Sequence, residues 1–429
     1  MTEVKQKRFF YGWVIVAVST MALVVSNGLS VLGLPVFYKP LIADLVGSGA
    51  VAADQSQSMM GGAAGMTFLL AGIFSPIGGL LLQRYSAKLL MCIGSVILGV
   101  GLVIYSQSNS SGLVYLSHSL LGASLGFVGV LVNTVLISNW FRRNRGIALG
   151  IVLTGTSFGG VVIPQIATPL ISRYGWRTAM IAVSLLVWVV LLPAAILLVR
   201  SRPSDMQLFP DGDANEDLGP DNLPRKLEGM TLVQAMRSPT FWIFSVCAAL
   251  IFYGIFVVSQ QLNLYLQTPK VGFTLQQAGD VQSKMFTASV IGKFLFGWLS
   301  DKFRSTRVAL VGAAIMFAST LVLLNLNGDN VLWFVVPFGL TYGGIFVLLQ
   351  LLVSDYFGLK NLGPILGAVT VIETIGGAVG TRITGILADR NGGDYTQGFT
   401  LLIATTGVSF ALILLLNFLH KPKYTSEPV

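Results

Sequence analysis

The sequence is poor in charged residues, cysteine and histidine. Asp, Glu, Lys and Arg together make up 10% of its 429 residues, whereas a soluble domain carries roughly 25%. The two cysteines, Cys92 and Cys247, lie in separate apolar runs, so we expect neither a disulfide framework nor a metal site. Neither of the two histidines, His118 and His420, has a catalytic partner near it in the sequence.

The motifs of several enzyme classes are also missing. The sequence contains no HExxH, no GxSxG, no Cys/His cluster and no P-loop. We therefore expect no enzyme, no cofactor and no nucleotide-driven pump. A sensor is disfavoured as well, because the tails and the central linker are too short to hold a sizeable output domain.

Long apolar runs dominate the rest of the sequence. Hydrophobic residues make up 54% of the chain, and the runs exceed 18 residues, which is the length that spans a bilayer. This pattern predicts an all-α membrane protein with twelve transmembrane helices in a lipid bilayer. The expected spans are about 10–38, 61–82, 89–107, 113–139, 146–171, 176–199, 241–266, 277–299, 308–326, 331–356, 363–388 and 399–419.

Two similar charged turns lie at matching places in the chain. Residues 297–307 read GWLSDKFRSTR and follow the eighth run, and residues 79–88 read GLLLQRYSAK and follow the second. This match predicts an internal duplication into two pseudo-symmetric six-helix bundles, residues 1–199 and 240–429. A polar linker, residues 200–239, joins them and is expected to form a short surface helix near residues 231–237.

Glycine is abundant, with 48 residues. Glycine is costly in water-exposed helices, but it lets membrane helices approach closely. Several runs carry glycines at near-helical spacing. This spacing predicts either tight, static packing between helices or smooth helix faces that let the two bundles rock against each other.

The distribution of positive charge predicts the orientation. With the N-terminus placed in the cytoplasm, 19 of the 27 Lys and Arg residues fall on the cytoplasmic side and 5 on the opposite side. This is the bias of the positive-inside rule. We therefore expect both termini in the cytoplasm and a multi-pass protein of the plasma membrane, with the short loops typical of a bacterial inner membrane. The net charge of +9 then needs no nucleic-acid partner.

The two six-helix halves, the polar linker between them and the basic turns after the second and eighth runs resemble the major facilitator superfamily. The turn after helices 2 and 8 of that superfamily reads roughly G-x-L-S/A-D-R/K-x-G-x-R/K. The resemblance implies that the turns form a conformational latch in which an acid on a helix end meets bases and the N-terminus of a neighbouring helix. Gln83 stands where the first turn should have its acid, so the second turn is expected to carry most of the latch. The residues matching the pattern are Gly79, Arg84, Lys88, Gly297, Asp301 and Lys302.

A narrower resemblance involves other segments. Residues 139–150, NWFRRNRGIALG, and the opening Tyr11-Gly12-Trp13 are similar to the monocarboxylate transporter and oxalate/formate antiporter families. This resemblance implies a small organic anion as substrate, carried with a proton or exchanged for another anion. The broader resemblance to the facilitator superfamily implies a monomer.

Few ionisable residues lie within the expected spans. Each costs at least about 2.5–3.5 kcal/mol to insert, so it usually faces a cavity or a partner. Lys293 precedes Gly297 by four residues, where the resembled families carry a basic residue, so it is the leading candidate for an anion site; the alternative is a lysine that snorkels to the cytoplasmic face. Asp280 and Lys284 are four residues apart and are expected to pair along one helix face.

Glu373 and Arg382 lie in the eleventh expected span. Glu373 is expected to take up a proton and couple transport to the proton gradient, or else to neutralise Lys293 or Arg382 in a structural pair. The chain has no obvious lysine near it, which argues against a dicarboxylate exchanger that needs two cations.

Several polar residues lie in the helices that line the central path of the superfamily. Each alone is more often an interhelical hydrogen bond than a ligand. The candidates for lining the substrate path are Asn27, Asn133, Tyr253, Gln260, Gln261, Asn263, Tyr342 and Gln350.

Together these observations predict a secondary active transporter that moves a small organic anion of the monocarboxylate type by alternating access, coupled to protons. The alternatives are a carrier or exporter of another organic solute or drug, and an anion/anion exchanger.

Overall fold

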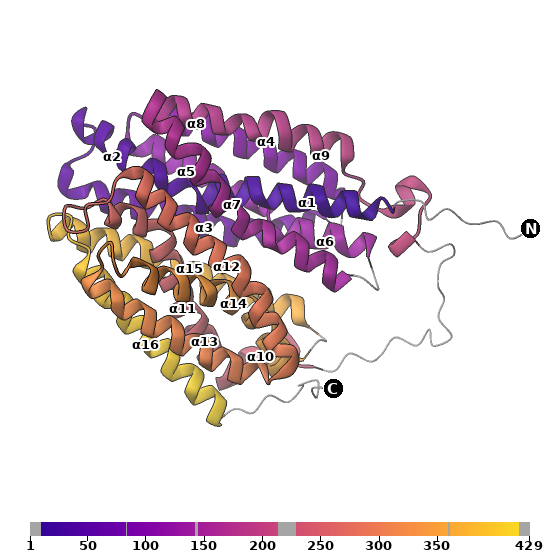
Figure 1. Ribbon diagram of the computed structural model, residues 1–429. Helices are drawn as coiled ribbons and strands as arrows, with labels where there is room; N and C mark the ends of the chain where they lie inside the picture. The colour runs from indigo at the N-terminus through magenta and orange to yellow at the C-terminus, as the bar shows by residue number, and fades with distance from the viewer. Residues whose placement is uncertain (1–9, 83, 142–144, 213–228, 359–360, 420–429) are drawn as a thin grey trace, which may run out of the picture.

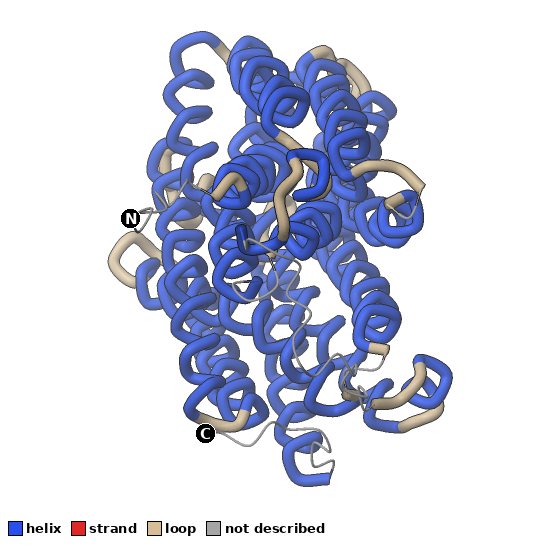
Figure 2. The backbone as a smooth tube through the Cα atoms, turned by 90° about the vertical axis from the view of Figure 1, so that its right-hand side faces the viewer, coloured by secondary structure: helices blue, strands red, loops and turns tan. Residues whose placement is uncertain are grey.

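The computed structural model describes residues 10–82, 84–141, 145–212, 229–358 and 361–419. These residues form helices and no strand, apart from one isolated bridge between Gly229 and Gly358. Figure 1 shows the helices in two groups, one from each half of the chain, and Figure 2 shows the same helices after a turn of 90°.

The first half contains α1 (Gly12–Asn27), α2 (Tyr38–Gly47), α3 (Ser56–Leu81), α4 (Ala87–Ser106), α5 (Ser111–Val128), α6 (Val130–Trp140), α7 (Arg145–Tyr174), α8 (Trp176–Leu185) and α9 (Leu192–Leu198). The second half contains α11 (Pro239–Leu266), α12 (Leu275–Lys302), α13 (Ser305–Thr320), α14 (Val331–Phe357), α15 (Leu362–Arg390) and α16 (Thr396–Leu419). Between them α10 (Leu232–Met236) confirms the short helix expected near residues 231–237.

Within the described residues, 11 helical stretches are long and apolar enough to cross a membrane. The remaining long helix, α12, has 28 residues and carries the charged side chains of Asp280, Lys284 and Lys293 along its length. Together they give the twelve helices and the two-bundle arrangement predicted from the apolar runs.

Three expected spans of the first half are divided in the structure. In the sixth span a π-helix (Leu186–Leu191) lies between α8 and α9, and the other two spans are broken after α1 and after α5. After α1 the chain forms a π-helix (Gly28–Leu32) and a 3₁₀-helix (Leu34–Phe37) before it turns into α2. At Gly28 the backbones of α1 and α7 touch, since a Cβ there would lie 2.9 Å from the Cα of Gly159. The expected span runs through this break because its residues are mostly apolar, although Gly33 and Pro35 within it favour a turn.

The second break separates α5 from α6 at Gly129. The backbone there is extended (φ −81°, ψ −158°), which frees carbonyl groups from the helical ladder. The Asn133 amide Nδ2 donates to the carbonyl oxygens of Val128 and Gly129, both at 2.9 Å. One asparagine therefore stabilises the break inside the bundle.

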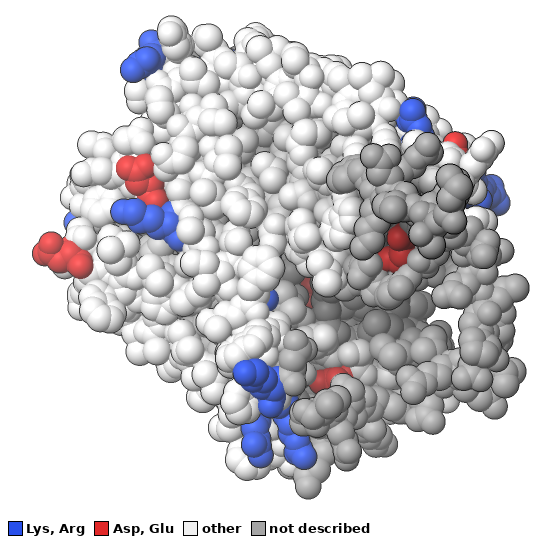
Figure 3. Space-filling view, turned by 45° about the vertical axis from the view of Figure 1, so that its right-hand side comes forward, with Lys and Arg blue, Asp and Glu red and all other residues white. Residues whose placement is uncertain are grey.

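The halves pack together through two helix pairs, α3 with α15 and α7 with α12. We call the end where α1 begins, α9 ends and α10 lies the linker end, on the right of Figure 1, and the opposite end, where α2 lies, the distal end. Among the described residues, the hydrogen bonds between the halves run from the distal end as far as Lys293, and none lies nearer the linker end. Figure 3 shows the surface hollowed between the two halves on the side that faces the linker end.

Candidate functional site: an intramembrane charge beneath a closed gate

Lys293 lies at the junction of the two halves. It projects from α12 of the second half, and its Nζ donates to the Leu153 carbonyl oxygen at 3.1 Å and to the Thr156 hydroxyl, both on α7 of the first half. The same ammonium lies 5.7 Å from the centre of the Phe346 ring on α14, within the range of a cation–π contact. Its contacts are thus neutral oxygens and a ring face.

No acid pairs with Lys293 in the described part of the chain. The ion pair recorded there joins Arg177 Nε to Asp44 Oδ2 at 3.5 Å, at the distal end. A cation in the membrane interior without an opposite charge is costly. The geometry therefore leaves Lys293 able to hold an anion between α12 and α7.

Glu373 lies buried on α15, with 6% of its surface exposed. One turn further along the same face, Gly377 packs directly against the Phe256 ring of α11. The carboxylate has no hydrogen bond or ion pair among the described residues, so it neutralises neither Lys293 nor Arg382 in this arrangement.

Aromatic rings connect the surroundings of these two charges. Phe346, which faces Lys293, lies 6.0 Å from Phe252, and Phe252 lies 5.3 Å from Phe256. Phe256 stacks at 3.6 Å on Phe68 of the first half. This aromatic cluster forms an apolar floor between the halves, in which a charge is poorly solvated.

Above this floor, hydrogen bonds close the distal end. The Tyr38 hydroxyl donates to Gln260 Oε1 at 2.6 Å, and Gln260 Nε2 donates to the Val31 carbonyl at 3.0 Å. Gln282 Nε2 donates to the Leu32 carbonyl at 2.8 Å. These bonds join the broken part of the first half to α11 and α12, and we call them, with the α3–α15 contacts below, the distal gate.

A carboxylate anchors the other side of the distal gate. Asp389, at the end of α15, accepts hydrogen bonds from the backbone N–H groups of Gln57 (2.9 Å) and Ser58 (2.6 Å) at the start of α3. An acid at a helix N-terminus is stabilised by the helix dipole and by the unpaired N–H groups there. Beside it, Arg382 donates to the Ser58 carbonyl and, at 3.4 Å, to the Tyr115 hydroxyl.

Glycines make this close approach possible. A Cβ on Gly61 of α3 would lie 2.2 Å from the Thr381 carbonyl oxygen, and one on Gly65 would lie 2.8 Å from the Ala378 carbonyl oxygen. At the linker end the situation is reversed: Gly150 on α7 and Gly297 on α12 have open space where a Cβ would stand. Gly297 lies one turn beyond Lys293 on the same face of α12.

The predicted path-lining residues separate into groups. Gln260 and Asn263 belong to the distal gate, since Asn263 Nδ2 donates to Gln282 Oε1 at 3.2 Å, and Gln261 Nε2 donates to the Thr381 carbonyl on α15. Tyr253 is buried against Gly380, and Tyr342 contacts the Phe286 ring at 5.9 Å.

Asparagine residues of the first half have local roles. Asn133 stabilises the α5–α6 break, and Asn27 Nδ2 donates to the neighbouring Ser26 hydroxyl at 3.5 Å. The side chain of Gln350, on α14, lies outside the described residues.

The expected pair on α12 is arranged differently. Asp280 Oδ1 accepts from Gln165 Nε2 at 3.0 Å and from Gln276 Nε2 at 3.1 Å. No ion pair with Lys284 is recorded among the described residues, and the Lys284 side chain is exposed. Asp280 therefore joins α12 to α7 across the halves, which a pairing argument along one helix does not anticipate.

At the linker end, no hydrogen bond or ion pair joins the turns that resemble a latch to the other half among the described residues. Arg84 is exposed and Lys88 half-buried, Gly79 faces the Leu131 side chain, and Lys302 lies 4.1 Å from the Trp298 ring centre. The side chain of Asp301 lies outside the described residues, as does Gln83.

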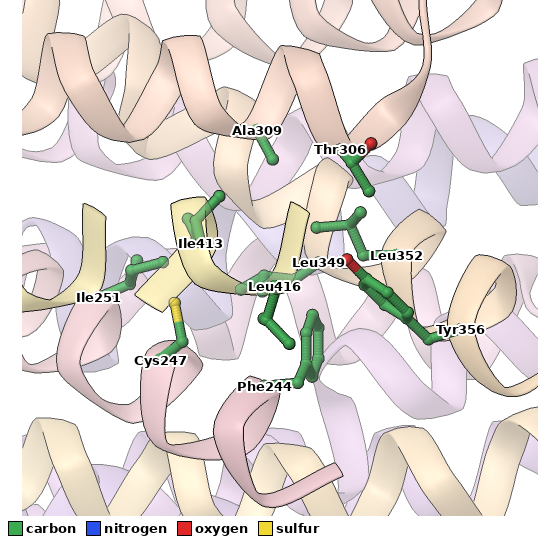
Figure 4. Close-up of a pocket in the computed structure, with 10 residues that line it drawn as sticks. All are labelled: Phe244, Cys247, Ile251, Thr306, Ala309, Leu349, Leu352, Tyr356, Ile413 and Leu416. Carbon is green, nitrogen blue, oxygen red and sulfur yellow. The ribbon is translucent and has the colours of Figure 1, made fainter. Parts of the chain in front are cut away.

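An apolar cavity of about 20 Å³ lies inside the second bundle, lined by residues such as Cys247, Ile413 and Leu416 (Figure 4). This is room for roughly one water molecule. It is too small for an organic substrate and lies away from the junction. No group of His, Cys, Asp and Glu in the described part of the chain is arranged to hold a metal ion.

Comparison with known proteins identifies the family. The model of the Major Facilitator Superfamily matches residues 9–279 and 264–428, which together cover both bundles. The chain belongs to the Major Facilitator Superfamily. Its two six-helix bundles are the arrangement of a facilitator transporter.

Two curated relatives illustrate the range of this superfamily around the chain. MFS transporter asaE of Aspergillus flavus is 27% identical over 75% of this chain and 69% of its own length. Monocarboxylate transporter 12 of Xenopus laevis is 25% identical over 76% of this chain and 73% of its own.

A solved structure shares the facilitator fold. It is a bacterial homologue of the human lysosomal transporter Spinster, in an inward-facing and unoccupied conformation. The TM-score is 0.69 at 16% identity, and the match covers 95% of this chain and 97% of that one.

Sequence reasoning missed several gate residues, among them Tyr38, Gln282 and Asp389. One signal for Asp389 was present: residues 385–392 read GILADRNG, which follows the same G-x-L-S/A-D-R/K-x-G pattern as the turn beginning at Gly297. The turn pattern therefore occurs at both ends of this facilitator, and the copy that contains Asp389 lies at the distal end.

Proposed function

We propose that this facilitator is a secondary transporter that moves a small organic anion of the monocarboxylate type across the membrane by alternating access, together with a proton. The observation that carries the proposal is Lys293, a cation inside a membrane helix whose recorded partners are neutral groups of both halves.

An anion at Lys293 would meet both halves at once. The ammonium already touches Leu153 and Thr156 of α7 while it projects from α12. A carboxylate bound there gains charge-assisted hydrogen bonds in a poorly solvated site. Because these contacts span the junction, the bound anion stabilises one relative position of the halves, and movement of the halves releases it.

The orientation proposed from the positive charges places the linker end and both termini in the cytoplasm. The closed distal gate is then the outer side, and the arrangement described here opens inward. In the alternate state the distal gate would separate and the faces carrying Gly150 and Gly297 would meet. We further propose a monomer in the plasma membrane, the inner membrane of a bacterium.

Glu373 is the proposed proton site. Its carboxylate is buried without a partner among the described residues, and a charged carboxylate is disfavoured in such surroundings. Protonation makes the unpaired group neutral. Gly377, one turn from Glu373, packs against Phe256 of the aromatic cluster, and Phe346 of the same cluster faces Lys293. The name of Monocarboxylate transporter 12, a relative at 25% identity, supports an anion of this class.

Uptake into proteoliposomes tests the proposal. Labelled lactate and pyruvate would be offered with and without an inward proton gradient, beside a neutral sugar and an organic cation. We expect gradient-driven uptake of the two anions, lost in Lys293→Ala and kept in the control Lys284→Ala, whose side chain is exposed. Uptake of the cation or sugar alone would contradict the anion site. Uptake that requires an anion loaded inside the proteoliposomes, and that does not require a proton gradient, would indicate an exchanger.

A further inference from the structure

A second pocket, which is polar, lies outside the junction at the linker end of the first half. It has a volume of about 380 Å³ and lies between the α3–α4 turn, the end of α6 and the segment that follows α9. Neither the transport site nor the distal gate involves this pocket.

The lining of this pocket is strongly basic. Arg84, Lys88, Arg200 and Arg202 all contribute to its wall, against one acid, Asp205. Asp205 accepts a hydrogen bond from the Arg202 backbone N–H at 3.0 Å. No ion pair joins it to any of the four bases in the described part of the chain. The pocket therefore has a surplus of positive charge.

The pocket wall is held in place by the fold. The Ser201 carbonyl accepts from Asn139 Nδ2 at 3.0 Å, and its hydroxyl accepts from the Lys88 backbone N–H at 3.2 Å. Trp140 Nε1 donates to the Arg200 carbonyl at 2.8 Å. These bonds fix the segment after α9 against α4 and α6, so the bases are presented on a fixed frame and not on a free tail.

Apolar side chains flank the same place on the outside of the bundle. Leu80 on α3 is 64% exposed, Leu89 on α4 is 44% exposed and Leu197 on α9 is 65% exposed. A ligand that uses both features has an anionic head and apolar chains. A soluble phosphate would use the bases alone and leave the apolar flank unused.

We propose that this pocket binds the phosphate headgroup of an anionic phospholipid, with its acyl chains along α3, α4 and α9. Basic pockets between helices at the cytoplasmic face of a membrane protein attract such headgroups, and each base near the surface contributes to the attraction. The lipid would join the α3–α4 turn to the segment that begins the linker.

Native mass spectrometry of the purified full-length protein tests the site, with phosphatidylglycerol and phosphatidylcholine supplied in equal amounts. We expect selective retention of phosphatidylglycerol, with an affinity about tenfold or more weaker in Arg84→Gln/Arg202→Gln. The matched control Arg304→Gln/Arg307→Gln removes two exposed bases from the other half at the same end and should bind as the wild type does. Arg84→Lys/Arg202→Lys keeps the charge and should keep most of the binding.

Two outcomes would overturn the proposal. One is equal retention of phosphatidylglycerol by the wild type and Arg84→Gln/Arg202→Gln. The other is displacement of phosphatidylglycerol by millimolar inorganic phosphate, combined with a rise in the thermal midpoint that is as large with phosphate alone as with phosphatidylglycerol. That result would assign the pocket to a soluble phosphate.

Discussion

The two halves of the chain share one six-helix arrangement and differ in where they break and where they carry charge. In the first half the chain is interrupted at residues 28–37 and at Gly129, whereas α11 and α14, the corresponding helices of the second half, run unbroken for 28 and 27 residues. The second half has Lys293 and Glu373 in its helix interiors. The first half has His118, buried and bonded to the Thr67 hydroxyl at 2.8 Å.

This difference suggests a division of labour. In the proposed transport cycle, Lys293 of the second half holds the substrate and Glu373 of the same half holds the proton. The first half contributes the uncharged oxygens of Leu153 and Thr156 to Lys293, and its interrupted segment, residues 28–37, contributes carbonyl groups to the distal gate. We infer that the two halves keep one six-helix frame and serve different parts of the proposed transport cycle.

Glu373→Gln should have the largest effect among the variants that test these different roles of the two halves. If the proton site belongs to the second half, the variant should keep exchange of labelled anion across the membrane and lose accumulation driven by a proton gradient. A gradient of one pH unit supports about tenfold accumulation by a one-proton symporter. His118→Gln is the control from the first half. Loss of accumulation in His118→Gln with Glu373→Gln unaffected would reverse the assignment.

Two glycine substitutions test the movement from opposite ends. Gly61→Val would collide with the Thr381 carbonyl and prevent the distal gate from closing, because overpacking of this kind costs about 1–3 kcal/mol. Gly297→Val meets open space now and should instead prevent closure at the linker end. Spin-label distances at each end should shift in opposite directions, with state populations changed roughly tenfold. Equal shifts in one direction would refute the rocking movement.

Asp389→Asn should loosen the distal gate more mildly. The charge at the start of α3 is lost while a weaker acceptor remains, so about 1 kcal/mol of gate stability should disappear, or about a fivefold change in the ratio of states. Labelling of a cysteine introduced at Gln261, in a background without Cys92 and Cys247, measures the opening. Asp329→Asn removes an exposed acid at the same end and should leave labelling unchanged; faster labelling in that control would mean that net charge, and not the cap, holds the gate.

Asn133→Leu affects the break between α5 and α6 and should have the smallest effect on transport. It leaves the Val128 and Gly129 carbonyls without their amide donor, at a cost of about 1–3 kcal/mol, so the thermal midpoint should fall by several degrees. Ser138→Ala, which loses one bond within α6, should change it little. A midpoint unchanged in Asn133→Leu would show that the break does not depend on this side chain.

The sequence predicted the features that depend on composition along the chain. Runs of bilayer length predict the helices, the two matching turns predict the duplication, and a lysine or glutamate inside an apolar run stands out at once. Lys293 and Glu373 were therefore identified from the sequence as candidates.

Features that depend on which faces meet in space were hidden. Tyr38 and Gln282 are single polar residues in mostly apolar stretches, and only the packing of the halves shows that they bond across the junction. Asp280 has a nearby lysine in the sequence, but its recorded partners are glutamines. The break after α1 was missed because its residues are mostly apolar, as in a membrane helix, although Gly33 and Pro35 within it favour a turn.

Binding of labelled lactate to the purified protein tests the central claim most directly. We expect saturable binding by the wild type and by Lys284→Gln, and binding at least about 30-fold weaker in Lys293→Gln, since removal of one partner of a buried charge pair costs about 2 kcal/mol or more. Lactate binding that is unchanged in Lys293→Gln would contradict the account, because the anion would then be held somewhere other than the junction of α12 and α7.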